Sequence, residues 1–143
     1  MLEMVNTSNA PMALGNYSHA VVWKDLIFVA GIASRDPVSN SVPGLVLDGS
    51  GKKISYDIVE ETKATLRNIK HILEGAGSDL EHVLDVTVFL TDMKDFQAYN
   101  KVYGEFFGQH RPARTTVGVS SLPGNISIEM KVIAVRANEN RAS

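Results

Sequence analysis

Apolar residues occupy every second position over the stretch 126–135, near the end of the printed sequence, and polar residues stand between them as far as Lys131. The apolar positions are Ile126, Ile128, Met130, Val132 and Ala134. Because the side chains of a β-strand point to opposite faces in turn, this period of two predicts a half-buried strand. Ser127, Glu129 and Lys131 then lie on the face that is turned away from the main core.

The residues just before this strand also have the composition of a strand. The stretch 111–119 contains the sequence ARTTV, and Pro123 and Gly124 follow it before the alternating segment begins. This pattern predicts two short strands joined by a Pro-Gly turn. Each strand carries a charge where a purely structural role would favour a neutral residue, Arg114 in the first strand and Glu129 in the second.

The N-terminal third of the chain predicts a hairpin followed by a long loop. The segments 17–23 and 26–31 are rich in β-forming residues and are separated by the pair Lys-Asp, which favours tight antiparallel pairing. From 32 to 55 the chain is dense in Pro, Gly, Ser, Asn and Asp, so we expect a loop with a short strand at 44–48. Loops of this length in a small domain often serve binding or assembly.

Two segments have the period of amphipathic helices. The first is predicted over 57–75, where Asp57 offers an N-cap and apolar residues recur at helical spacing until two glycines end the pattern. The second follows Asp92 and ends near Gly108. Its aromatic stripe consists of Phe96, Tyr99, Tyr103, Phe106 and Phe107.

A β-branched run at 82–91 separates the two helices and predicts a further strand. The element order is therefore β-β-α-β-α-β-β, an α+β fold with both helices on one face of a mixed sheet. The other face is left uncovered. It includes Ile133 and Val135, which are too apolar to remain solvated, so we expect a homo-oligomer in which the sheets pack together.

Composition limits what kind of protein this is. The 143 residues, 44% of them hydrophobic and 21% charged, suffice for one core but not for two, so a single domain over 1–143 is expected. The sequence shows neither a long apolar run nor a basic segment followed by an apolar one at its start. These features predict a cytoplasmic protein with no membrane partner.

The residue types that are present also restrict the chemistry. The chain has no cysteine, which excludes disulfides, thiol nucleophiles and thiolate metal sites. Its four histidines are scattered and match no metal-binding spacing, so no metal is expected. The formal charge of −2 and the lack of a dense basic block argue against a general nucleic-acid surface.

Several motifs, in the same order along nearly the whole chain, resemble those of the Rid (reactive intermediate deaminase, YjgF/RidA) family. They are NAPMALGNYSHAV (9–21), FVAG (28–31), the stretch 72–107, RPARTTV (111–117) and IEMKVIAV (128–135). The resemblance implies a chorismate-mutase-like fold and a homotrimer whose sheets line a central barrel, with one site in each cleft between subunits. It also implies a small-molecule carboxylate substrate and no cofactor.

Within the family, the segments 31–58 and 100–131 look most similar to the 2-aminomuconate deaminase branch. The commoner imine deaminases of the family carry a Gln after the glycine, and Ile32 stands at that position here. The Cys that often follows the family's Arg is Thr116 in this chain, so thiol chemistry is not required. We expect a deaminase similar to 2-aminomuconate deaminase, with a RidA-like 2-iminobutanoate/2-iminopropanoate deaminase as the alternative.

The resemblance implies catalytic roles for three residues. Arg114 matches the family's substrate-binding Arg, whose planar fork can hold a carboxylate by two hydrogen bonds. Glu129 matches the acidic residue that holds or activates a water, and Tyr17 matches the Tyr that closes the cleft. Each residue also has a simpler interpretation: a surface Arg, a Glu paired with Lys131, and an ordinary strand aromatic.

Five further residues are expected to contact the substrate. They are Gly31, Phe89, Thr116, Arg35 and His19. Gly31 would let its backbone N–H approach a ligand oxygen, and Phe89 would form a wall of the pocket. A dicarboxylic substrate needs a second cation, for which Arg35 is the first candidate and His19 and Lys131 are weaker ones.

These residues suggest one reaction. An enamine tautomerises to its imine, Arg114 and the Gly31 amide hold the carboxylate, and a water oriented by Glu129 attacks the imine carbon so that ammonia departs. Two other classes of function remain open. One is RNA cleavage or inhibition of translation, for which the chain offers neither a histidine pair nor a basic cluster. The other is a trimer that binds a carboxylate metabolite without turnover.

Overall fold

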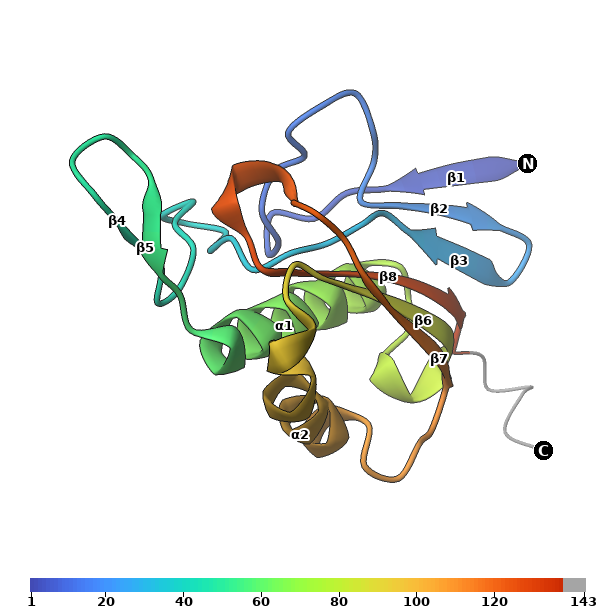
Figure 1. Cartoon of the computed structure of the whole chain (residues 1–143). Helices are drawn as coiled ribbons and strands as arrows, with labels where there is room; N and C mark the ends of the chain where they lie inside the picture. Colours follow the sequence, from blue (N-terminus) through green and yellow to red (C-terminus); the bar gives the residue numbers. More distant parts are fainter. Residues whose placement is uncertain (138–143) are drawn as a thin grey trace.

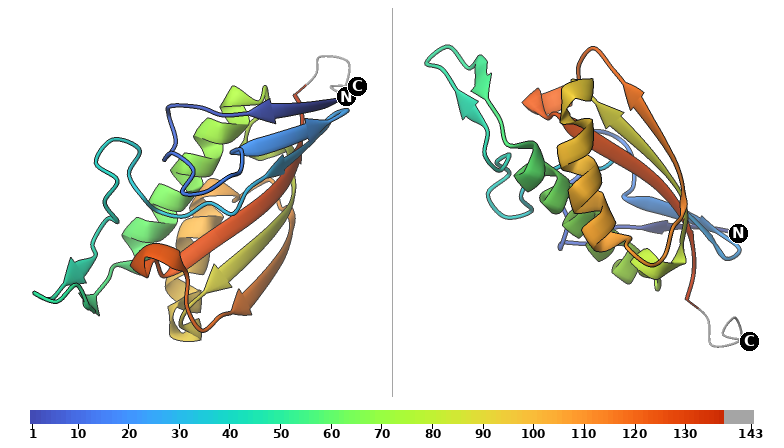
Figure 2. Two further views of the ribbon diagram at one scale, coloured as in Figure 1. Left: turned by 90° about the horizontal axis from the view of Figure 1, so that it is seen from above. Right: turned by 60° about the horizontal axis from the view of Figure 1, so that its bottom comes forward.

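The computed structural model describes residues 1–137, and it has the α+β architecture that the sequence predicts. Within these residues, six strands form one mixed sheet and two helices pack against one of its faces (Figure 1, Figure 2). A separate two-stranded hairpin stands apart from the sheet. The structure contains a single chain, so the expected trimer and its central barrel stay predictions.

The bounds of the elements agree closely with the expected segments. The main sheet contains β1 (Leu2–Val5), β2 (Ala20–Trp23), β3 (Leu26–Val29), β6 (Val83–Leu90), β7 (Ala113–Gly118) and β8 (Ile128–Val135). The separate hairpin contains β4 (Val46–Leu47) and β5 (Lys53–Ser55), and the helices are α1 (Ile58–Gly75) and α2 (Phe96–Phe106). Single turns of 3₁₀ helix lie at Leu80–His82, Met93–Asp95 and Pro123–Asn125.

The strand order in the sheet is β1-β2-β3-β8-β6-β7. Strand β8 pairs antiparallel with β3 on one side and with β6 on the other, whereas β7 pairs parallel with β6 at the sheet edge. The Pro-Gly turn before β8 exists, with Gly124 and Asn125 at φ values of 72° and 61°. It does not make a hairpin of β7 and β8, because β6 lies between them.

Hydrophobicity explains why β6 takes the inner place. It buries Val83, Val86, Val88 and Leu90 completely, while the side chains of β7 are half-buried or exposed. A strand with this many apolar residues is stabilised most where neighbours cover it on both sides. The sequence ARTTVG suits the edge.

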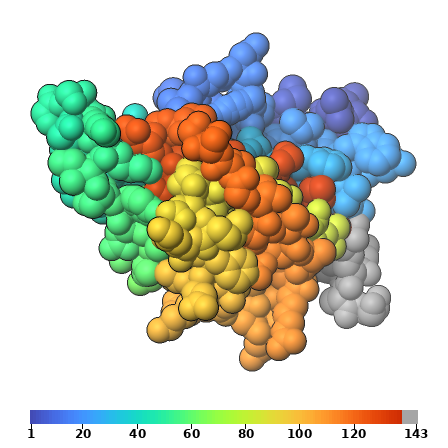
Figure 3. Space-filling view, viewed as in Figure 1, coloured from blue at the N-terminus to red at the C-terminus, as the bar shows by residue number. Residues whose placement is uncertain are grey.

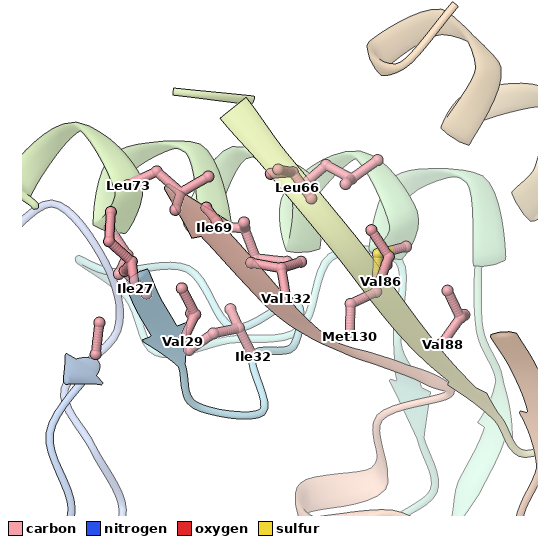
Figure 4. Packing of buried hydrophobic residues seen from close by; sticks show 14 of the residues in the cluster. Ile27, Val29, Ile32, Leu66, Ile69, Leu73, Val86, Val88, Met130 and Val132 are labelled. Carbon is pink, nitrogen blue, oxygen red and sulfur yellow. The ribbon is translucent and has the colours of Figure 1, made fainter. Parts of the chain in front are cut away.

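Helix α1 begins where its capping residue predicts. The Asp57 side chain accepts a hydrogen bond from the backbone N–H of Glu60 at 3.1 Å, which satisfies a free donor of the first turn. The buried face of the helix then packs on the sheet, as Figure 4 shows for Leu66, Ile69 and Leu73. These three side chains are fully buried, so this contact forms the centre of the core.

Two strands, β1 and β5, were not expected from the sequence. Strand β1 was not predicted, because Leu2 and Met4 are exposed and its short sequence shows no buried face. The expected short strand at 44–48 is β4, and it pairs with β5 to form the hairpin that projects from the body of the molecule (Figure 3). Both elements lie at the margin of the fold, where burial gives the weakest sequence signal.

The sheet face opposite the helices carries exposed apolar side chains, as the alternation in β8 predicts. Trp23, Phe28 and Val117 are exposed, and Ile133 beside Phe28 is half-buried. Exposed aromatic and aliphatic side chains on one sheet face are typical of an association surface. Association through it stays a prediction.

A charge on this face should therefore prevent association without unfolding the chain. We expect the wild-type protein to have a mass near three times 15.6 kDa by light scattering, and Phe28→Glu to lower the mass towards one chain. Val38→Glu is the matched control, because Val38 is 95% exposed in a loop outside the sheet. A wild-type monomer at micromolar concentration would contradict the expectation.

Candidate active site

A cavity of about 150 Å³ lies where β3 ends, between the N-terminal loop and the turn before β8. Four of the residues expected from the sequence line it: Tyr17, Gly31, Arg35 and Glu129. The remaining wall is apolar and comes mainly from Pro11, Leu14, Ile32 and Ile126. The fold thus brings together residues that are far apart in the chain.

Glu129 supplies the carboxylate of this cavity. It lies on the open face of β8, opposite Phe89 of β6, and it is half-buried. Burial raises the pKa of the Glu129 carboxyl, because the charged form loses hydration. A carboxyl shifted in this direction takes up a proton more readily near neutral pH, as a general base must.

Gly31 is required by the position of Glu129. A Cβ atom at residue 31 would lie 2.5 Å from Oε2 of Glu129 and 3.1 Å from its Cδ. No side chain fits there without displacing the carboxylate. The backbone of Gly31 and the Glu129 carboxylate therefore form one compact polar surface inside an otherwise apolar cavity.

Ile32 holds this arrangement through the backbone. Its N–H donates to the carbonyl of Met130 at 2.8 Å, and its carbonyl accepts from the N–H of Met130 at 2.9 Å. This isolated bridge extends the β3–β8 pairing past the end of β3. It explains why Gly31 stays beside Glu129 although the chain leaves the regular sheet at that point.

Tyr17 and Arg35 close the outer side of the cavity. The Tyr17 hydroxyl accepts a hydrogen bond from the N–H of Leu14 at 3.2 Å. The Arg35 guanidinium donates through Nη2 to the carbonyl of Met12 at 3.0 Å and through Nη1 to the side chain of Asn40. Arg35 therefore joins two loops as well as lining the cavity.

Arg114 and Thr116 are not in this cavity. Both point to the helix side of the sheet, because they share the face of Val86 and Val88 in the neighbouring strand. Arg114 donates to Oδ1 of Asn100 at 2.7 Å, and its guanidinium lies 4.6 Å from the ring centre of Tyr103. Within one chain, the expected carboxylate clamp and Glu129 thus lie on opposite faces of the sheet.

Thr116 lies on the helix side of the sheet with Arg114, and its hydroxyl is hydrogen-bonded to the hydroxyl of Tyr99. Phe89 lies on the open face next to Glu129, at the margin of the cavity and not among the residues that line it. The structure thus places Phe89 near the carboxylate but leaves Thr116 on the far side of the sheet.

His19 lies outside the cavity. It is 5% exposed, its Nδ1 accepts from the N–H of Thr7 at 3.1 Å, and its Nε2 lies 2.7 Å from the carbonyl of Pro11. Because Nδ1 accepts, Nε2 must carry the proton and donate to Pro11. Both ring nitrogens are occupied by the backbone, so His19 anchors the N-terminal loop.

Sequence reasoning missed the apolar wall. Pro123 and Gly124 were interpreted only as a turn and Ile126 only as a core position of the strand, although all three directly precede Glu129 in the chain. Pro11 and Leu14 precede Tyr17 in the motif that carried the resemblance, which was the available signal. Among the described residues, no group of three or more His, Cys, Asp or Glu side chains could hold a metal ion.

Comparison with known proteins gives the family of this chain. The family model described as Endoribonuclease L-PSP matches residues 7–136. The chain belongs to this family, also called YjgF/Rid. It is 41% identical to a RutC family protein of Pyrococcus horikoshii, over 95% of this chain and 99% of that protein.

Two further comparisons add an activity and a structure. The chain is 38% identical to the 2-iminobutanoate/2-iminopropanoate deaminase of Capra hircus, over 99% of this chain and 95% of that protein. The structure of the E. coli YjgF gene product matches with a TM-score of 0.82 and 33% identity, over 94% of this chain and 99% of that chain. This Rid-family chain therefore has close relatives that are named imine deaminases.

The location and the branch expected from the sequence are not decided by these relatives. Two others are named mitochondrial and chloroplastic, so a cytoplasmic location stays a prediction. The described helices include none with the length and apolarity needed to cross a bilayer. The names support imine deaminases in general and do not specifically support the 2-aminomuconate branch.

The raised pKa of Glu129 can be measured directly. We expect its carboxyl to titrate above 4.5 in ¹³C-detected NMR, and Gly31→Ala to bring it back towards 4.5 by pushing the carboxylate outward. A pKa that is higher in the folded state stabilises the fold at low pH, and this contribution is lost as pH rises through the folded pKa. Relative to Glu129→Gln, wild-type stability should therefore fall as pH rises above about 4.3. A Glu129 carboxyl that titrates at or below 4.5 would contradict the assignment.

Proposed function

We propose that this Rid-family chain hydrolyses small 2-imino acids, or the enamines that tautomerise to them, to 2-oxo acids and ammonia. The observation that carries the proposal is the half-buried Glu129 carboxylate against Gly31 in an apolar cavity of about 150 Å³. Such a cavity suits a short aliphatic substrate and one ordered water. The activity named for the goat and human relatives supports the same reaction.

The chemistry follows from the position of the carboxylate. Glu129 accepts a proton from water as the water oxygen bonds to the imine carbon, and the C=N bond becomes a C–N single bond. Glu129 returns this proton to nitrogen, which gives a carbinolamine with one hydroxyl and one amino group. Glu129 then takes the hydroxyl proton and passes it to the amino nitrogen, so that the C–N bond breaks, ammonia leaves and the oxygen forms the new C=O bond. Since imine hydrolysis already proceeds in water, positioning and the exclusion of bulk water suffice as the contribution of the protein.

The substrate carboxylate needs a cation on the open face. Arg114 lies on the opposite face in its own chain, but it is on β7 at the sheet edge, where a neighbouring copy can approach. We therefore propose that a site is completed between two subunits, with Glu129 and Gly31 from one and Arg114 from the next. The apolar open face supports such an assembly.

Substitution of Arg114 tests the clamp. Arg114→Lys should reduce kcat/KM for 2-iminobutanoate roughly 30- to 700-fold, because an ammonium cannot form two parallel hydrogen bonds to a carboxylate. This factor corresponds to a loss of about 2–4 kcal/mol of transition-state stabilisation. Ammonia release from freshly generated imine is the measurement, with circular dichroism as the control for folding. Turnover near the wild-type rate in the folded variant would remove Arg114 from the site.

The size and charge of the cavity favour a RidA-like monocarboxylic substrate over 2-aminomuconate. Arg35 is the available second cation, but its guanidinium already donates to Met12 and Asn40. A group that holds two loops is not free to recognise a second carboxylate. We therefore propose 2-iminobutanoate and 2-iminopropanoate as the substrate type.

Parallel assays of the two substrates decide between these branches. Wild-type protein should release ammonia faster from 2-iminobutanoate than from 2-aminomuconate. Arg35→Ala should lower both rates by a similar factor of about ten, through loss of loop order. A selective loss on 2-aminomuconate would instead identify Arg35 as the residue that recognises the second carboxylate.

The description of the family model as an endoribonuclease does not lead us to propose RNA cleavage. Lining residues of the described cavity include no histidine, and one carboxylate and one arginine are its charged groups. Acid–base cleavage of a phosphodiester needs both a base and an acid beside a cationic phosphate site. The cavity suits a small carboxylate better.

A further inference from the structure

A buried glutamate on α1 touches both sides of the candidate active site from behind. Glu61 is fully buried, and its Oε1 accepts two hydrogen bonds. One comes from the backbone N–H of Ser127 at 2.9 Å, and the other from the Ser34 hydroxyl at 3.1 Å. A single carboxylate oxygen therefore connects two segments that are far apart in the sequence.

Those two segments are the walls of the cavity. Ser34 lies between Ala33 and Arg35, which line one wall, and Ser127 follows Ile126, which lines the other. Ser34 and Ser127 are themselves fully buried and face away from the solvent. A shift of the Glu61 carboxylate therefore breaks one of these hydrogen bonds or moves a wall with it.

Each wall also has an anchor of its own. Asn68, two helical turns after Glu61, donates through Nδ2 to the carbonyls of Ala33 at 2.8 Å and Arg35 at 2.9 Å. On the other side, Lys53 donates to the Ser127 hydroxyl at 3.0 Å. Of these three side chains, Glu61 is the one that contacts both walls, so it adds to the backbone bridge between Ile32 and Met130 in fixing their separation.

We infer that Glu61 is a positioning residue of the active site: together with the backbone bridge between Ile32 and Met130, it holds the wall of Ser34 and the wall of Ser127 at the spacing that keeps Glu129 against Gly31. This inference rests on the proposed deaminase function for its catalytic readout. It does not rest on that function for its structural readout, because wall order can be measured without a substrate. A misplacement of about 1 Å can reduce a rate roughly a hundredfold.

The ionisation of Glu61 bears on the same geometry. Its Oε2 is buried and has no hydrogen-bond partner among the described residues. Burial raises the pKa of the Glu61 carboxyl. The hydrogen bonds from Ser127 and Ser34 and the positive charge of Lys53 act in the opposite direction and lower this pKa. Tyr56 is the other titratable group that interacts with Glu61. When Glu61 ionises as the pH rises, a buried negative charge with one unpaired oxygen lies next to the Ser34 and Ser127 segments.

Three variants test the role. Glu61→Ala removes both hydrogen bonds and should lower kcat for 2-iminobutanoate at least tenfold, with a smaller change in KM, and speed exchange of the Ser127 amide about tenfold. Glu61→Gln keeps an acceptor oxygen and should restore exchange to within about threefold of wild type. Thr62→Val is the matched control. The Thr62 hydroxyl is buried in the same helix and donates its hydrogen bond to the carbonyl of Ile58, not to either wall, so kcat and amide exchange should both stay unchanged.

A further variant keeps the inference falsifiable if Glu61→Ala does not fold. Ser34→Ala breaks one of the two bonds and should increase the exchange rate at residues 33–35 about threefold or more.

The outcomes separate the two proposals. Unchanged amide exchange in Glu61→Ala and Ser34→Ala, or a Glu61→Gln protein that exchanges as fast as Glu61→Ala, would overturn the positioning role. Wild-type protein that releases no ammonia, with wall exchange behaving as expected, would overturn the deaminase proposal and leave the connection between the walls intact.

Discussion

Strand β8 is hydrogen-bonded to a neighbour on each side, and the site depends on this double pairing. The register with β3 and with β6 fixes which side chains face the helices and which face away. Met130 and Val132 enter the core under α1, so Glu129 must lie on the open face. A slip of one residue would bury the carboxylate in the core, which makes the register costly to change.

Local features of the fold could be predicted from the sequence, and long-range ones could not. The period of two in β8 and the cap at Asp57 depend on neighbouring residues, and the structure agrees with both. The order of strands depends on which apolar surfaces match across the whole chain. This is why β6 separates β7 from β8, although a Pro-Gly turn connects the latter two.

The candidate site shows the same division. The motifs indicated Gly31 and Glu129, and the bridge between Ile32 and Met130, which continues the β3–β8 pairing, brings them side by side. That Arg114 lies on the other face could not be foreseen, because it follows from the register between β6 and β7. Glu61 escaped notice for another reason: a lone acidic residue in an amphipathic helix is usually solvated, and sequence does not reveal which irregular backbone needs an acceptor.

The pairing of β3 with β8 also constrains how the protein is made. Residues 26–28 are paired with 133–135, so the middle of the sheet cannot close until most of the chain has left the ribosome. Until then β3 and β6 each present an unpaired, strongly apolar edge. Contacts of such high sequence separation form slowly, because the loop-closure entropy must be overcome first. The order of synthesis thus leaves these two strand edges open until β8 can pair with both of them.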